Sequence, residues 1–206
     1  MDAPGKSSLG GVTSDLLRRA LEDPGDPRVP PLPSQARELL ETLDAPPRLA
    51  AHLRAVHDVA GILAGWVRQH YPGVRFDAAA VVFGAAIHDI GKVVHVGELS
   101  GPGSAHEQAG YELLLAQGVE EAYARFARTH ALWDAEDVGV EDLLVSLADK
   151  AWKAKRVPEL EKRVTDVLAA ASGEPSWQVF MSLDDLLDRI AAGADGRLAF
   201  QSAYPV

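Results

Sequence analysis

The chain contains no cysteine, which excludes a disulfide framework and any metal site built on thiolates. It also contains no uninterrupted apolar stretch long enough to cross a bilayer. The opening segment, MDAPGKSSLGGVTSDLL, carries one lysine and no apolar centre, so we expect no secretory signal there. Together these absences lead us to expect a cytoplasmic protein with no membrane partner.

The chain also has fewer basic residues than acidic ones. Twenty Lys and Arg residues stand against 30 Asp and Glu residues, which gives a formal net charge of -10. A surface this negative repels a nucleic-acid backbone at long range, so we expect no nucleic-acid partner. A small phosphorylated substrate stays compatible with this charge, because a bound metal ion supplies positive charge locally.

Hydrophobic residues make up 47% of the 206 residues, which is enough for one packed domain that buries roughly 70% of its unfolded surface. Apolar side chains recur at spacings of three and four along most of the chain, which is typical of helices. No stretch alternates apolar and polar residues in the way an exposed strand does. We therefore predict an all-α fold.

The expected helices cover residues 13–23, 34–44, 47–70, 77–90, 105–117, 119–130, 141–156, 158–171 and 176–192. We expect residues 1–12, which are small and polar, to be disordered, and the tail after residue 192 to be frayed. Residues 24–33 should form a proline-rich connector, and residues 91–104 a glycine-rich loop. We divide the chain into an N-terminal extension (1–45), a core (46–156) and C-terminal helices that pack on the core (157–206).

A histidine and an aspartate stand side by side in the most apolar predicted helix, within GAAIHDIGK at residues 84–92. Burying charge is costly unless the charge is paired or bound to a metal. Adjacent helical side chains differ by about 100°, so His88 and Asp89 can reach one point beyond their shared edge. Imidazole and carboxylate suit a divalent transition metal or Mn²⁺ better than Ca²⁺. The small residues Gly84, Ala85 and Ala86 would let other helices approach.

Other predicted helices offer further ligands of the same two types, namely His52, His106, His130 and Asp149. With His88 and Asp89 they make six ligands, enough for two metal ions with positions left for water or substrate. His57 lies about 140° around its helix from His52, so only one of the two can face such a site, and we favour His52. Glu98, Ser104 and Glu107 are candidates to support the ligands.

The order of these residues resembles the HD superfamily of metal-dependent phosphohydrolases. HLRAVHDVAGILA resembles the first motif of that family, AAIHDIGK resembles its HD motif, and the similarity covers about residues 46–156. The resemblance implies an HD-domain helical bundle with its metal site between central helices, ligated by His52, His88, Asp89, His106, His130 and Asp149. The two extra histidines resemble the dinuclear branch, with Asp89 bridging two metals. In a second arrangement, His106 and His130 contact substrate beside a single metal.

The resemblance also implies hydrolysis of a phosphoester or phosphoanhydride in a small phosphorylated substrate, which we expect to be a nucleotide, by metal-activated water. The expected cofactor is one or two divalent ions of Fe, Mn, Co, Ni, Zn or Mg. Asp89, Lys92 and Asp149 are the predicted catalytic residues, and Lys92, Lys150 and Lys153 the predicted substrate contacts. The alternative functions are a di-iron oxygenase and a non-catalytic module in which the metal ions only hold the helices together. An exposed apolar face on 176–192 would indicate a homodimer.

Overall fold

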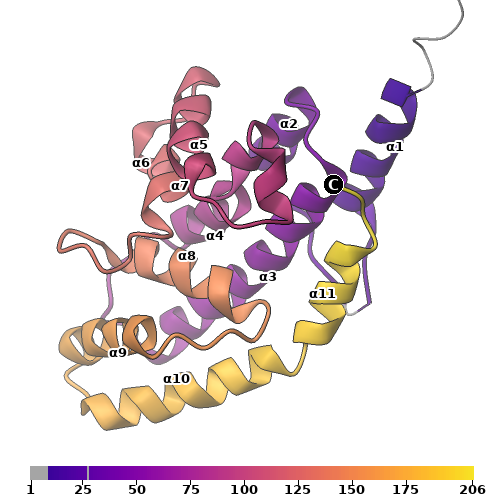
Figure 1. The fold of residues 1–206 in the computed structure, drawn as a ribbon. Coiled ribbons are helices and arrows are strands. Elements are labelled where there is room, and N and C mark those ends of the chain that lie inside the picture. Colours follow the sequence, from indigo (N-terminus) through magenta and orange to yellow (C-terminus); the bar gives the residue numbers. More distant parts are fainter. Residues whose placement is uncertain (1–8, 27) are drawn as a thin grey trace, which may run out of the picture.

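Helices account for the architecture of the chain, whose computed structural model describes residues 9–26 and 28–206 (Figure 1). The α-helices are α1 (Leu9–Glu22), α2 (Ser34–Thr42), α3 (Pro47–His70), α4 (Ala78–Ile87), α5 (Ala105–Ala116), α6 (Glu121–Ala124), α7 (Phe126–Thr129), α8 (Val140–Ala151), α9 (Pro158–Ser172), α10 (Ser176–Ala191) and α11 (Ala194–Ser202). Two 3₁₀ turns, η1 (Ile90–Val93) and η2 (Val96–Leu99), follow α4. The described part contains no strand, so the all-α prediction is confirmed.

The long helix α3 lies at the centre and packs against α1, α4, α8 and α11. Pro47 occupies its first turn, where a missing amide hydrogen costs nothing. Its apolar stripe is fully buried, including Leu49, Leu53, Val56 and Leu63. Because α3 is covered on several sides, side chains that it contributes to the interior are held rigidly.

Two hydrophobic clusters share the interior and meet along α3 and α4. One contains the second half of α3 with α8, α9 and α10, and the other contains the first half of α3 with α1, α2 and α5. Leu53 belongs to the second cluster and Ala55 to the first, while Ala85 and Ala86 divide in the same way. The His and Asp candidates lie close to this junction, so apolar packing surrounds a polar centre.

Gly84 allows α4 and α7 to approach closely, as predicted from its size. A Cβ atom at Gly84 would lie 2.5 Å from Cδ2 of the fully buried Phe126 ring. Real Cβ atoms do not come that near to another carbon, so any side chain here would push α7 away. The close contact places the end of α7, where His130 begins, beside the end of α4.

Several predicted boundaries were wrong. The helix expected over 77–90 ends at Ile87, and His88 and Asp89 lie in the turn that leads into η1. The segment 119–130 forms two single-turn helices that meet at Arg125, and the helix expected to reach 156 ends at Ala151. Compact turns therefore replace continuous helix where the polar candidates gather.

The C-terminal tail is also ordered, contrary to the expected fraying. It forms α11, whose Arg197 pairs with Asp58 of α3 at 3.2 Å, and the buried Phe200 joins the interior. At the other end of the chain α1 starts at Leu9, within the segment expected to be disordered, while residues 1–8 lie outside the described residues.

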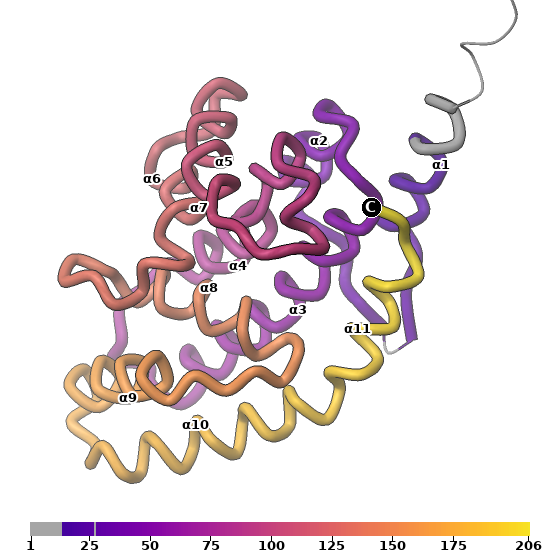
Figure 2. The backbone as a smooth tube through the Cα atoms, in the orientation of Figure 1, coloured from indigo at the N-terminus to yellow at the C-terminus, as the bar shows by residue number. Residues whose placement is uncertain are grey.

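The N-terminal extension and the tail lie side by side on the core, as Figure 2 shows near the chain end. The Tyr204 hydroxyl donates to Asp23 at 2.9 Å, and the Arg48 amide donates to the Pro205 carbonyl at 3.0 Å. The buried Arg54 guanidinium donates to the carbonyls of Ala20, Val29 and Pro30. The extension is thus bound to α3 by hydrogen bonds as well as apolar packing.

Two further expectations concern surfaces. Within the described ranges, each helix is too short or too polar to serve as a membrane span. On α10, Trp177, Phe180 and Met181 are exposed, which is the kind of apolar face on which the predicted homodimer depends. The homodimer itself stays a prediction.

Candidate metal centre

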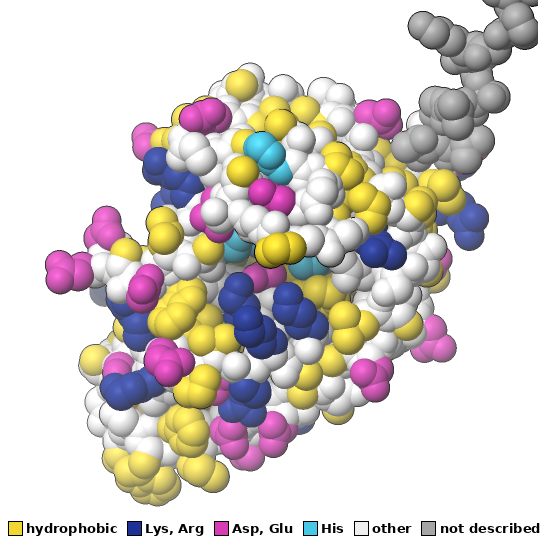
Figure 3. Space-filling view, viewed as in Figure 1, with side chains coloured by type: hydrophobic (Ala, Val, Ile, Leu, Met, Phe, Trp, Pro, Cys, Tyr) yellow, Lys and Arg dark blue, Asp and Glu magenta, His cyan; other side chains and the backbone are white. Residues whose placement is uncertain are grey.

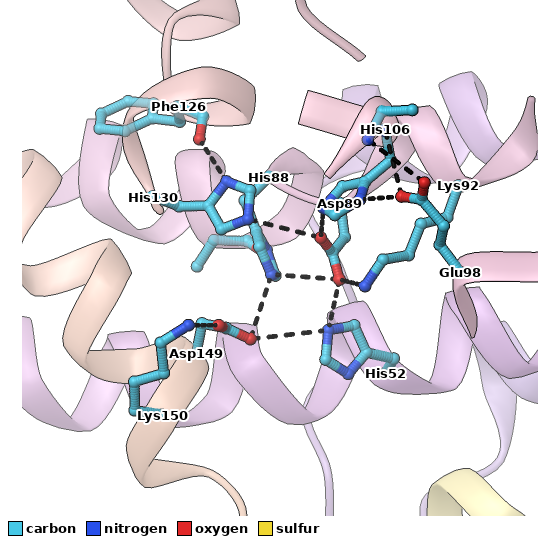
Figure 4. A network of polar contacts seen from close by, with 12 residues as sticks. His52, His88, Asp89, Lys92, Glu98, His106, Phe126, His130, Asp149 and Lys150 are labelled. Atoms are coloured by element: carbon cyan, nitrogen blue, oxygen red, sulfur yellow. Dashed lines mark hydrogen bonds and ion pairs between the residues drawn. The ribbon is translucent and has the colours of Figure 1, made fainter. Parts of the chain in front are cut away.

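Six predicted ligands from five parts of the fold converge on one buried point (Figure 4). They are His52 on α3, His88 and Asp89 in the turn after α4, His106 at the start of α5, His130 directly after α7 and Asp149 on α8. All six are buried, with at most 8% of each residue exposed. The structure thus brings together every residue that the sequence analysis proposed as a ligand.

One half of the cluster joins α3, the turn after α4, and α8. The Nε2 atom of His88 lies 3.5 Å from Asp149 Oδ1, and the Nε2 atom of His52 lies 4.0 Å from the same oxygen. One ligand atom of each of these residues lies within 4.8 Å of the others, a separation that a single ion can bridge. These three side chains form a first group that could hold a metal ion.

Asp89 connects this group to the other half. Its Oδ2 lies 3.0 Å from His52 Nε2 and 3.6 Å from His88 Nε2. Its Oδ1 lies 3.0 Å from His106 Nε2 and 3.6 Å from His130 Nε2. His88, Asp89 and His130 form a second group able to hold an ion. One carboxylate therefore presents a different oxygen to each half.

The outward nitrogens of His88 and His130 are held by hydrogen bonds to backbone carbonyls. His88 Nδ1 lies 2.9 Å from the Ala85 carbonyl and His130 Nδ1 lies 3.1 Å from the Phe126 carbonyl. Because a carbonyl only accepts, both Nδ1 atoms carry the proton, and each Nε2 lone pair points inward. Such bonds fix the tautomer and ring orientation that metal-ligating histidines need.

The hydrogen bonding of the inward-facing Nε2 atoms shows whether a metal ion fits the centre. The Nε2 atoms of His52, His88 and His106 are buried and make no hydrogen bond, even though two of them lie 3.0 Å from Asp89 oxygens. Buried polar atoms in native proteins almost always have a partner, and three orphans around one carboxylate need an explanation. A divalent cation satisfies all three at once, so the donor set fits such an ion.

Electrostatics keep the centre in the state that binds cations. Burial raises the pKa of the Asp89 carboxyl, but His88, His106 and His52 outweigh it and hold that pKa well below its usual value. Burial lowers the pKa of His52, and it lowers the pKa of His130 to about 4. An anionic carboxylate beside neutral imidazoles is the protonation pattern that metal ligands require.

His106 differs from these two histidines. Burial opposes its protonation, yet the contacts with Asp89 and Glu98 prevail and raise its pKa. Its Nδ1 lies 2.5 Å from Glu98 Oε2, so this imidazole stands between two carboxylates.

The three predicted substrate lysines differ in position. Lys92 Nζ lies 2.5 Å from Asp89 Oδ2, and Lys150 Nζ lies 2.6 Å from Asp149 Oδ2, so both border the cluster. Lys153 is exposed, and its Nζ lies 5.5 Å from the centre of the Trp152 ring. Figure 3 shows Lys and Arg side chains gathered beside a hollow in which acidic and histidine side chains are visible. The negative protein thus concentrates positive charge at this opening.

His57, the alternative to His52 on the same helix, lies outside the cluster. His57 Nδ1 donates to the Val82 carbonyl of α4 at 3.0 Å. Trp152 is buried beside the cluster, and its ring centre lies 5.0 Å from that of His52.

One supporting residue escaped the sequence analysis. The buried Asp142 accepts hydrogen bonds from Thr129 Oγ1 at 2.6 Å and from Arg125 Nε at 3.2 Å. It thereby fixes α7, and with it His130, against α8. Only the turn at Arg125, which the sequence does not mark, brings these groups together.

A comparison with protein-family models identifies the fold around this centre. The model of the HD domain matches residues 49–151, a range that begins just before His52 and ends just after Asp149. The chain belongs to the HD domain family. Comparisons with curated proteins and with solved structures gave no match. HD domains are a superfamily of metal-dependent phosphohydrolases, in agreement with the buried His and Asp groups found here.

Proposed function

We propose that this HD domain is a hydrolase of the dinuclear branch that cleaves a phosphoester or phosphoanhydride in a small phosphorylated substrate, with a nucleotide as the expected class. The observation that carries the proposal is the position of Asp89, whose two oxygens face two separate sets of inward imidazole nitrogens. A bridging carboxylate of this kind is what a pair of metal ions would need.

The ligand assignment follows from the two Asp89 oxygens, and it adds His106, which lies 3.0 Å from Oδ1 but outside both groups, to the second position. His52, His88 and Asp149 would hold one ion, His106 and His130 would hold a second, and Asp89 would contribute to both. When bound, such ions lower the pKa of water to about 7 and stabilise the negative charge of a phosphoryl group. No cysteine or serine nucleophile lies among the clustered side chains, in keeping with attack by water.

The chain itself supplies binding and orientation. Lys92 and Lys150 present ammonium groups at the border of the cluster, where they would pair with phosphate oxygens. The exposed Lys153 is placed to meet a more distant phosphate. Each would also attract an anionic substrate towards a protein whose net charge otherwise repels it.

The experiment begins with metal-free protein that is reloaded separately with Mn²⁺, Co²⁺, Fe²⁺, Zn²⁺ or Mg²⁺. Release of phosphate or cleavage of an anhydride is measured on nucleoside mono-, di- and triphosphates, dinucleoside polyphosphates and simple phosphomonoesters. Asp149→Asn should abolish activity, whereas Asp166→Asn, which changes an exposed carboxylate of α9 paired with Lys162, should leave it unchanged.

Two outcomes would contradict the proposal. Inactivity on the whole panel with every metal would exclude the hydrolase. Oxygen uptake by the Fe²⁺ form, with a mixed-valent iron signal and no hydrolysis with redox-inert metals, would identify the di-iron oxygenase instead.

A further inference from the structure

Glu98 approaches His106 from a different element and makes more contacts than an ordinary surface carboxylate. It lies in η2, eight residues before His106. Its Oε2 accepts from His106 Nδ1 at 2.5 Å and from the His106 backbone amide at 3.2 Å, and its Oε1 accepts from the Ala105 amide at 3.2 Å. Figure 4 shows the carboxylate on the opposite side of the His106 ring from Asp89.

The first amides of α5 depend on this distant carboxylate. Ser104 occupies the N-cap position but makes no side-chain capping hydrogen bond. Helices leave their first amides without internal partners, and the preceding residue usually supplies the acceptor. Here Glu98 supplies the acceptor, so one carboxylate connects both the start of α5 and the imidazole of His106 to η2.

The glycines around this contact keep space for it. A Cβ atom on Gly103 would overlap the Glu98 carboxyl group and lie 2.6 Å from its Cγ. A Cβ atom on Gly91 would overlap the His106 carbonyl and lie 2.6 Å from the Gly110 amide nitrogen. The loop that follows Asp89 is therefore pressed against α5, and the missing side chain at Gly103 leaves the space that the Glu98 carboxylate occupies.

We propose that Glu98 is a positioning residue, which holds the His106 proton on Nδ1 and aims Nε2 at the Asp89 oxygen of the second metal position. This inference rests on the proposed function and deepens it. Without an acceptor at Nδ1 the ring can take the other tautomer, whose protonated Nε2 cannot ligate a metal. No other residue among those described accepts a hydrogen bond from His106 Nδ1.

Helix capping alone is the competing explanation, and a double-mutant cycle separates the two. Mn²⁺ binding is titrated by electron paramagnetic resonance in the wild type, Glu98→Ala, His106→Ala and the double variant. The expected loss for Glu98→Ala is about 10- to 100-fold in affinity for one of two ions, the usual effect of removing a partner of a ligand. In the His106→Ala background the same change should have no effect, because Glu98 acts through His106.

Two conservative variants sharpen the test. Glu98→Gln keeps an acceptor oxygen and should retain most of the affinity. Gly103→Ala leaves Glu98 in the chain but displaces its carboxylate, so it should weaken the same ion. Glu112→Ala, which removes an exposed carboxylate of α5 that pairs with Gln108, is the matched control and should bind like the wild type.

The outcomes also separate this proposal from the proposed function. If the wild type binds two ions and Glu98→Ala binds both equally well, the positioning role is wrong and the metal centre stands. An equal loss in the presence and absence of His106 would show that Glu98 only caps α5. If the wild type binds no ion, the metal centre itself is wrong.

Discussion

Asp89 Oδ1 lies 3.0 Å from His106 Nε2, while the other oxygen of the same carboxylate faces His52 at 3.0 Å. Asp89 occupies the turn between α4 and η1, between the two partners. The carboxylate thus contacts both halves of the centre, each through a different oxygen.

Replacing Asp89 should therefore affect both metal positions. We expect Asp89→Asn to reduce bound Mn²⁺ to background, since the amide lacks the negative charge that balances a divalent ion. His130→Ala, which touches only one half, should retain one tightly bound ion. Metal content after gel filtration, measured by plasma mass spectrometry, checks both. Two retained ions in Asp89→Asn would show that this carboxylate does not bridge.

Lys92 should matter for turnover. Its ammonium lies at the border of the cluster, where a phosphoryl group would gain negative charge during reaction. Removing one such charge-stabilising group costs about 10²- to 10³-fold in kcat, and we expect Lys92→Ala to fall in this range. Steady-state kinetics with saturating metal measure the effect, with Lys162→Ala on the exposed side of α9 as control. An unchanged kcat would assign Lys92 to structure alone.

The sequence was enough to predict the all-α fold and the residues of the centre. The residues that converge could be predicted because His88, Asp89 and Asp149 stand in apolar segments, where a polar residue needs a reason. The turns could not be predicted, because contacts such as the close approach of Gly91 to the backbone of α5 form only in the folded chain. The ordered tail was missed for the same reason, since Arg197 gains its partner Asp58 only in the folded chain.

Acid should destabilise the metal-free protein. An unfolded histidine takes up its proton near pH 6.5, whereas burial keeps folded His130 neutral until about pH 4. Between these values the unfolded chain binds more protons, so stability falls as the pH falls. The lowered pKa of His52 acts in the same direction, and the raised pKa of His106 acts in the opposite direction above pH 6.5.

Urea unfolding in EDTA at pH 7 and pH 4.5 measures this dependence. The contribution of His130 reaches about 3 kcal/mol at most, from 1.4 kcal/mol per pKa unit. His130→Phe should show a shallower loss between the two pH values. A stability that does not change with pH in the wild type would mean that burial does not keep His52 and His130 neutral in the folded state.

Arg54 should be essential for holding the N-terminal extension. Its fully buried guanidinium serves three carbonyls of the extension, and Arg54→Leu would leave them without donors. An unsatisfied buried group costs 1–3 kcal/mol, so we expect a loss of about 3 kcal/mol or more in the free energy of unfolding. Arg68→Leu, at an exposed position of the same helix, is the control. Equal stability of the two variants would contradict this role.

The most direct test of the account is a metal titration of the metal-free protein followed by two signals at once, bound Mn²⁺ and phosphate released from the best substrate of the panel. We expect two ions to bind, activity to appear only as they bind, and Asp89→Asn to abolish both signals. Full activity in the metal-free protein, or binding of no ion at all, would contradict it.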